Sequence, residues 1–134
     1  MPPADTPLPG RFARPLALLT LAYTLVLVLA THYPKPEDLL GPDPPSDKTL
    51  HFIAYGVLGI LAMAALAARG HRSLRAAAML LLSLAILAAV DEATQPLFGR
   101  TAELWDWVYD LIGLTAGIAV VAIALRTIAR RPLQ

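Results

Sequence analysis

The chain has 134 residues, of which 57% are hydrophobic and 16% are charged, and its formal net charge is +1. A soluble domain usually carries about 25% charged residues, so this composition argues against an ordinary water-soluble domain. The chain contains no cysteine, which excludes disulfides, thiol catalysis and cysteine-based metal sites. No patch of lysine and arginine is interleaved with aromatic residues, so we expect no nucleic-acid partner.

Four apolar segments, each with at least 15 consecutive residues lacking Asp, Glu, Lys and Arg, follow one another along the chain. Roughly 20 apolar helical residues cross the hydrocarbon core of a bilayer. The sequence therefore predicts an all-α membrane protein, a four-transmembrane-helix bundle with spans at about 15–33, 48–68, 74–95 and 105–125. Outside this domain of residues 15–126, we expect a disordered proline-rich tail over 1–14 and a basic tail over 127–134.

The first span, residues 15–33, has an alternative interpretation as a cleaved signal peptide, because Arg11 and Arg14 precede it. Its apolar run is long for a signal peptide, and the residues that follow it make a poor cleavage site. We therefore expect it to be retained as a helix. Residues 34–47 form a proline-rich polar loop, and Pro96 sets the latest end of the third span.

The distribution of basic residues predicts the orientation of the bundle. Eight of the eleven lie at the two ends of the chain and in the turn between the second and third spans, whereas Lys35, Lys48 and Arg100 lie on the other side. The positive-inside rule then places both termini in the cytoplasm. Nine of the eleven basic residues are arginine, a bias that suggests a GC-rich bacterial genome, so we expect a bacterial cytoplasmic (inner) membrane. Nine of the ten acidic residues lie on the extracytoplasmic side. There we expect an interfacial aromatic belt of Tyr33, Trp105, Trp107 and Tyr109.

The third and fourth spans are short, because their uncharged runs, 76–90 and 111–125, would extend only about 22 Å as helix. Polar residues flanking these runs must therefore lie within the outermost helical turns and face the bundle interior. Asp91 and Glu92 fall at a helix C-terminus, the negative pole of the helix dipole. We expect a positive partner for them: Lys48, Arg100, protonated His51 or a bound cation.

Helical spacing groups the outer polar residues on shared faces. One stripe of the second span holds Lys48, His51, Phe52 and Tyr55. A stripe of the fourth span holds Asp106, Asp110, Gly113 and Gly117, whose glycines allow close helix approach. His32 and His71 have no such neighbours and are interpreted as interfacial or loop residues. The sequence predicts an outer pocket with these ligand-binding candidates: Lys48, His51, Tyr55, Asp91, Glu92, Gln95, Arg100, Asp106 and Asp110.

The ordered motifs resemble those of the VanZ-like family of small bacterial integral membrane proteins. The similarity covers residues 47–117: Asp47-Lys48-x-x-His51-Phe52-x-x-Tyr55-Gly56, then Asp91-Glu92-x-x-Gln95, Arg100, and Asp106-x-x-x-Asp110-x-x-Gly113-x-x-x-Gly117. Relatives tend to have Asn where this chain has Asp110, and Pro-Gly-Arg where it has Phe98-Gly99-Arg100. The founding member is associated with low-level teicoplanin resistance, so the resemblance implies action at the cell envelope without specifying a reaction.

Three functions are compatible with these patterns. The first is an envelope-facing protein whose pocket binds a lipid headgroup, a glycan-lipid or a lipophilic compound. The second is a membrane hydrolase or transferase acting on an envelope lipid, with catalytic candidates Glu92, His51, Asp91 and Tyr55. The third, a transporter or channel component, is disfavoured because few polar residues lie deeper in the spans.

The sequence leads us to expect no cofactor and no metal. If a metal is bound, the oxygen-rich set of His51, Glu92, Asp106 and Asp110 would suit Mg²⁺ or Mn²⁺ better than Zn²⁺. The expected partners are the lipid bilayer and a lipid or glycan-lipid ligand on the outer face. The sequence leaves the oligomeric state open.

Overall fold

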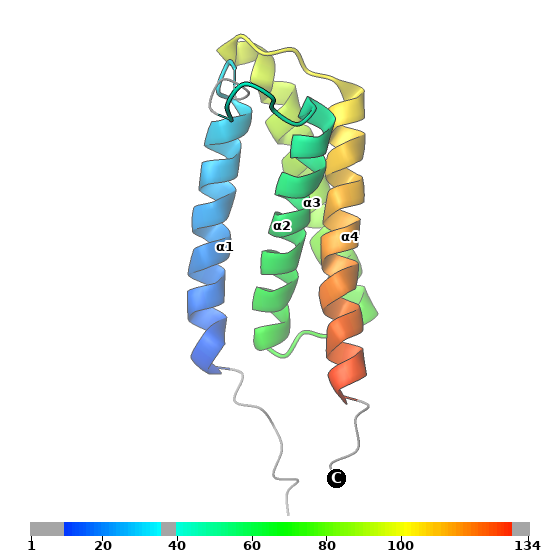
Figure 1. Cartoon of the computed structure of the whole chain (residues 1–134). Helices are drawn as coiled ribbons and strands as arrows, with labels where there is room; N and C mark the ends of the chain where they lie inside the picture. The colour runs from blue at the N-terminus through cyan, green and yellow to red at the C-terminus, as the bar shows by residue number, and fades with distance from the viewer. Residues whose placement is uncertain (1–9, 36–39, 130–134) are drawn as a thin grey trace, which may run out of the picture.

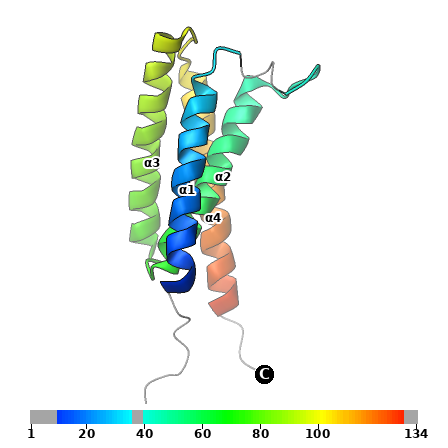
Figure 2. The ribbon, with the colours of Figure 1, turned by 90° about the vertical axis from the view of Figure 1, so that its left-hand side faces the viewer.

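The structure, a computed structural model, describes residues 10–35 and 40–129. These residues form α1 (Gly10–Thr31), α2 (Asp47–Ala68), α3 (Leu74–Thr94), the short 3₁₀ helix η2 (Gln95–Phe98) and α4 (Leu104–Ala129). The four long helices alternate in direction along one axis, and both described chain ends lie at the same end of the bundle (Figure 1). Figure 2 shows the bundle from the side of α1, with α3 on the left and α2 on the right.

All four long helices are long and apolar enough to cross a membrane. Large apolar side chains cover the outside of the bundle, and Leu18, Leu21 and Leu82 are each exposed by 63% or more. A continuous apolar exterior of this kind is unfavourable in water and favourable against lipid chains. The fold is thus compatible with the multi-pass membrane protein that the sequence predicts.

The largest boundary difference from the prediction is at α1, which begins at Gly10 rather than near residue 15. Pro15 lies inside the helix, in its second turn, where the missing N–H removes one intrahelical hydrogen bond. At the other end of the chain α4 extends to Ala129 rather than 125. The parts of the predicted tails and loop at 1–9, 36–39 and 130–134 lie outside the described residues.

Short side-chain caps determine where α2 and α3 begin. The hydroxyl of Ser46 accepts a hydrogen bond from the Thr49 N–H at 3.2 Å, and that of Ser73 accepts one from the Ala76 N–H at 3.1 Å. Gly99 ends η2 in the left-handed region, with φ of 81°, and turns the chain toward α4. The caps and this turn bring the start of α2, the end of α3 and the start of α4 to one end of the bundle.

The central helix α2 packs against α1 and α3, and most closely against α4. A Cβ atom placed on Gly113 would overlap the carbonyl oxygen of Phe52, and one placed on Gly117 would overlap that of Gly56. The two backbones are therefore in direct contact along this seam. This confirms the prediction that the glycines serve close helix packing.

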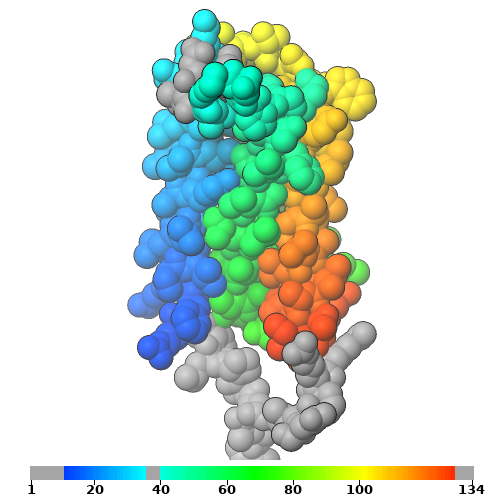
Figure 3. Space-filling model, in the orientation of Figure 1, coloured from blue at the N-terminus to red at the C-terminus, as the bar shows by residue number. Residues whose placement is uncertain are grey.

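Below the polar end, the interior is apolar. Leu58, Leu114 and Ala88, from three different helices, are fully buried in one cluster. A second cluster around Met63 and Ile118 lies nearer the described chain ends. In Figure 3 the segment 40–46, coloured teal, lies over the opposite end of the bundle where α1 and α2 meet.

Candidate functional site

A cluster of buried polar side chains lies at the end of the bundle opposite the described chain ends. Each of the four long helices contributes, and every member is at most 9% exposed: Thr31, His51, Asp91, Glu92, Gln95, Asp106 and Asp110. Burying charged groups is costly unless they are paired or bind an ion. Together with the contacting residues His32, Asp47, Lys48, Tyr55, Arg100 and Glu103, this set is called the polar cluster below.

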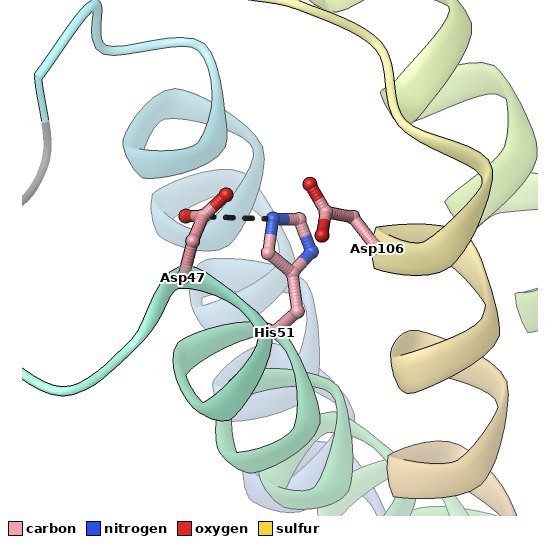
Figure 4. Close-up of side chains that lie close together, drawn as sticks. All are labelled: Asp47, His51 and Asp106. Carbon is pink, nitrogen blue, oxygen red and sulfur yellow. Dashed lines mark ion pairs between the residues drawn. The ribbon is translucent and has the colours of Figure 1, made fainter.

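His51 joins α2 to α4. Its Nδ1 atom lies 2.8 Å from Oδ1 of Asp110, and both side chains are buried. Its Nε2 atom lies 4.0 Å from Oδ1 of Asp47. Figure 4 shows the imidazole ring between the carboxylates of Asp47 and Asp106. The ring is thus held among acids from two helices, one turn above the glycine seam.

Asp91 joins α3 to α1 and α2. Its Oδ1 accepts a hydrogen bond from the Thr31 hydroxyl at 3.0 Å, and its Oδ2 accepts one from the Tyr55 hydroxyl at 2.9 Å. Nδ1 of His32 lies 3.4 Å from Oδ1, while Nε2 of His32 lies 2.9 Å from the Thr94 hydroxyl. The carboxylate is therefore satisfied mainly by neutral hydroxyls.

Glu92 is held by different donors. Its Oε2 accepts a hydrogen bond from Nε2 of Gln95 at 2.9 Å, and its Oε1 accepts one from the backbone N–H of Glu103. No Lys, Arg or His side chain of the described residues lies within ion-pair distance of Glu92. Two of the four partners predicted for Asp91 and Glu92 are not used, because Lys48 and Arg100 pair with other acids. Protonated His51 and a bound cation stay as predictions.

The two permanent cations lie at the rim of the polar cluster. Nζ of Lys48 donates to Oε2 of Glu103 at 3.1 Å and lies 3.4 Å from Oδ1 of Asp106, without hydrogen-bond geometry to the latter. Arg100 donates from one terminal nitrogen to both oxygens of Asp47, at 3.2 and 3.1 Å, and from the other to the Thr31 carbonyl at 3.3 Å. Arg100 thereby fixes the loop before α4 to the ends of α1 and α2.

The polar cluster carries more acid than base. Its six carboxylates, counted from the contacts above, are those of Asp47, Asp91, Glu92, Glu103, Asp106 and Asp110. Against them stand one lysine, one arginine and two histidines, so at least two carboxylates exceed the bases even if both histidines are protonated. Three buried acceptor atoms, moreover, receive no hydrogen bond from the described residues: Oε1 of Gln95, Oδ1 of Asp106 and Oδ2 of Asp110.

Among the open cavities that adjoin the polar cluster, two share part of their lining. One, of about 370 Å³, is polar and lies between the loop segments above α1, α2 and α4; Arg100, Glu103 and Thr101 line it. The other, of about 320 Å³, is a mostly apolar groove between α1 and α2, lined by residues such as Leu27 and Ile53. Both cavities share three lining residues: Asp47, Leu50 and Arg100. The polar cavity, called the polar chamber below, and the apolar groove are thus neighbours, and Arg100 lines both.

Two triads of the polar cluster have the spacing of metal ligands. In each triad, the ligand atoms lie within 4.8 Å of one another: Asp47, His51 and Asp106 in one, and His51, Glu92 and Asp110 in the other. The second triad is fully buried and spans three helices, whereas the first includes the part-exposed Asp47.

All nine ligand-binding candidates predicted from the sequence lie in this one region. The polar cluster also includes four residues outside the predicted candidate set: Thr31, His32, Asp47 and Glu103. Thr31 and His32 close the first apolar span, and their polar character at a helix end was the available signal. His32 does lie in the turn just after α1, as predicted, but the expectation that it has no acidic neighbour is wrong, because its Nδ1 atom lies 3.4 Å from Oδ1 of the buried Asp91.

The predictions for His71 and for the aromatic belt are confirmed only in part. His71 lies exposed in the turn between α2 and α3, which confirms its assignment to a loop. Among the predicted belt aromatics, Trp105 is 63% exposed, but Trp107 is partly buried. Its indole N–H donates to the Ala85 carbonyl at 3.2 Å, so it packs α4 onto α3 instead of facing outward.

Comparison with protein-family models, with curated proteins and with solved structures finds no match to this chain.

Proposed function

We propose that the protein spans the bacterial cytoplasmic membrane with both termini in the cytoplasm, and that its outer end binds an amphiphilic envelope molecule. The headgroup would occupy the polar chamber, and an acyl or other lipophilic chain would occupy the groove between α1 and α2. The observation that carries this proposal is the junction of a polar and an apolar cavity at Arg100. The excess of basic residues at the opposite end of the bundle supports the orientation.

Arg100 suits a phosphate-bearing headgroup. The guanidinium has five N–H donors, and its hydrogen bonds to described residues use the two terminal nitrogens and leave Nε without an acceptor. Arginine binds phosphate through a planar fork of donors. Asp47 holds that fork at the mouth of the chamber, and Lys48 adds a second cation on the same side.

The resemblance to the VanZ-like family supports an envelope-facing role, and we propose membership in that family together with an effect on glycopeptide susceptibility. Loss of the gene product, or its Arg100→Gln variant, is expected to change teicoplanin susceptibility in the parent bacterium. Unchanged susceptibility would separate this protein from the founding member's role without affecting the lipid-binding proposal.

The binding proposal is tested by photo-crosslinking at neighbouring positions. Ala30 lines the groove, whereas Leu29, at the same depth on α1, is 64% exposed and does not. A photoreactive residue at position 30, in nanodiscs of phosphatidylglycerol and phosphatidylethanolamine, is expected to capture specific lipid in excess over position 29. Arg100→Gln should reduce capture of the anionic lipid at position 30 only. Equal labelling at the two positions would contradict the proposal.

A second candidate function is an enzyme acting on the bound lipid. The hydrogen bond between His51 and Asp110 favours it, because a carboxylate that orients an imidazole is the usual support for a general base. His51 also lines the groove. Glu92, the other acid–base candidate, has both oxygens engaged by donors. Turnover of lipid substrates by the purified protein, lost in His51→Gln, would support this alternative; absence of any product would leave only binding.

A further inference from the structure

We propose that His51, Glu92 and Asp110 form a binding site for one divalent first-row metal ion, which ties α2, α3 and α4 together. This inference goes beyond the proposed lipid binding and does not depend on it. It also departs from the expectation, drawn from sequence alone, that no metal is bound.

The spacing of the three side chains fits one ion. Nitrogen and oxygen ligands lie about 2.0–2.2 Å from such an ion, so neighbouring ligands are about 3 Å apart and opposite ones about 4.4 Å apart. The 2.8 Å between Nδ1 of His51 and Oδ1 of Asp110 matches a neighbouring pair. All ligand atoms of the triad lie within 4.8 Å of one another, so small shifts of the side chains would bring them to the distances that one ion requires.

Unpartnered buried acceptors supply the second, independent observation. Oδ2 of Asp110 receives no hydrogen bond from the described residues, although its side chain is only 1% exposed. Oε1 of Gln95 also receives no hydrogen bond from the described residues. The amide nitrogen of the same side chain donates to Glu92, so the amide group of Gln95 lies beside the triad. If the Gln95 amide were flipped, its oxygen would face Oε2 of Glu92, and two acceptors would lie against each other. Acceptors buried without donors are rare unless they bind a cation or water.

The charge balance points to a cation as well. Glu92 has no basic side chain of the described residues within ion-pair distance, and Asp110 has only His51. Glu92 lies near the C-terminal, negative pole of α3, so a cation there is doubly favoured. In the other triad, Asp47 already pairs with Arg100, and Asp106 with Lys48. These two cations would repel a metal ion there.

The types of ligand in the triad restrict which metal ion it would bind. The oxygen-rich set predicted from the sequence, which favoured Mg²⁺ over Zn²⁺, included Asp106, but the triad does not. One imidazole with two carboxylates suits Mn²⁺, Fe²⁺ or Zn²⁺ better than Mg²⁺, which prefers oxygen ligands alone. The intrinsic affinity order predicts that Zn²⁺ binds more tightly than Mn²⁺, and Mn²⁺ more tightly than Mg²⁺.

The test uses the full chain in detergent, stripped with a chelator and titrated with Mn²⁺ while free Mn²⁺ is followed by electron paramagnetic resonance. The expected result is saturable binding of one equivalent, with Zn²⁺ displacing it more readily than Mg²⁺. Pulsed resonance on the wild-type complex should detect a directly coordinated imidazole nitrogen. Because this readout needs no substitution, it does not depend on any variant folding.

Glu92→Gln and Asp110→Asn are each expected to weaken binding by roughly a hundredfold or more, since loss of even a supporting residue costs 10–100-fold. Asp43→Asn is the control, because Asp43 lies exposed in the loop before α2 and outside the polar cluster. Absence of saturable Mn²⁺ binding, or of the nitrogen coupling, would overturn the proposal. So would loss of binding in Asp106→Asn combined with unchanged binding in Glu92→Gln.

Discussion

At the scale of single residues, the polar end is stabilised by neutral donors as much as by ion pairs. Asp91 is the clearest example, because hydroxyls from two other helices satisfy its two oxygens. A hydroxyl donor needs little desolvation compared with a lysine or arginine, and a buried carboxylate can be satisfied by it at lower cost. Tyr55 also stacks parallel to His51, with ring centroids 6.4 Å apart. One residue therefore contacts both Asp91 and His51.

The contribution of Tyr55 can be measured with Tyr55→Phe, which removes only the hydroxyl. The expected loss in free energy of unfolding is about 1–2 kcal/mol, above the average for hydrogen bonds in membrane proteins, because the acceptor is a buried carboxylate. Unfolding by SDS titration provides the measurement. Tyr109→Phe is the control, since Tyr109 is 36% exposed, and it should change stability little. Equal effects from the two substitutions would argue against the role of the Asp91 contact.

Arg100→Lys tests whether the planar fork matters, because lysine keeps the charge but cannot hold Asp47 and the Thr31 carbonyl together. We expect faster amide hydrogen exchange in residues 99–103, by roughly fivefold for each hydrogen bond of about 1 kcal/mol that is lost. The control is Arg75→Lys, at an exposed position at the other end of the bundle. Unchanged exchange in 99–103 would show that charge alone anchors the loop.

At the scale of secondary-structure elements, the α2–α4 seam decides how the polar residues meet. The glycine stripe lets the two backbones touch, and the stripe continues upward into Asp110 and Asp106. His51 lies one turn before Tyr55 on α2, so the same close approach brings its ring against Asp110. Widening the seam should therefore disturb both the packing and the polar cluster.

Gly117→Ala should widen the seam, because the added Cβ would overlap the carbonyl oxygen of Gly56 on a backbone that cannot yield. The expected cost is about 1–3 kcal/mol in unfolding free energy, typical of overpacking. Gly56→Ala is a matched control, since its Cβ would lie an ordinary 3.6 Å from the Gly113 carbonyl oxygen. SDS titration compares them. A more damaging Gly56→Ala would show that the seam is not packed as described.

At the scale of the whole molecule, the two ends of the bundle differ in chemistry. One end gathers the buried acids, the cavities and the proline-rich loop, and the other carries the basic turn and the described chain ends. The apolar outer surface between them matches a bilayer interior in character. A site at one end alone favours binding at one face of a membrane over passage across it.

The orientation can be tested directly because the chain has no native cysteine. Thr101→Cys at the polar end and His71→Cys in the basic turn both lie at exposed positions. In spheroplasts, a membrane-impermeant maleimide should label position 101 and leave position 71 unlabelled until the membrane is disrupted. The reverse pattern would invert the proposed topology, and labelling of both positions before disruption would contradict a membrane-spanning bundle.

The four helices and the grouping of the outer acids could be predicted from the sequence, because both follow from local hydropathy and from helical spacing. The sequence also indicated a close helix approach at Gly113 and Gly117, since glycines four residues apart leave a helix face without side chains. The structure identifies the helix that approaches them as α2. Which donor meets which acid was decided only by the tertiary structure. Thr31 and Asp91 are 60 residues apart, and Lys48 pairs with Glu103 and Asp106, which are also distant from it along the chain. Helix packing selected among these pairings, and that selection left Glu92 and Asp110 beside one histidine without a permanent cation.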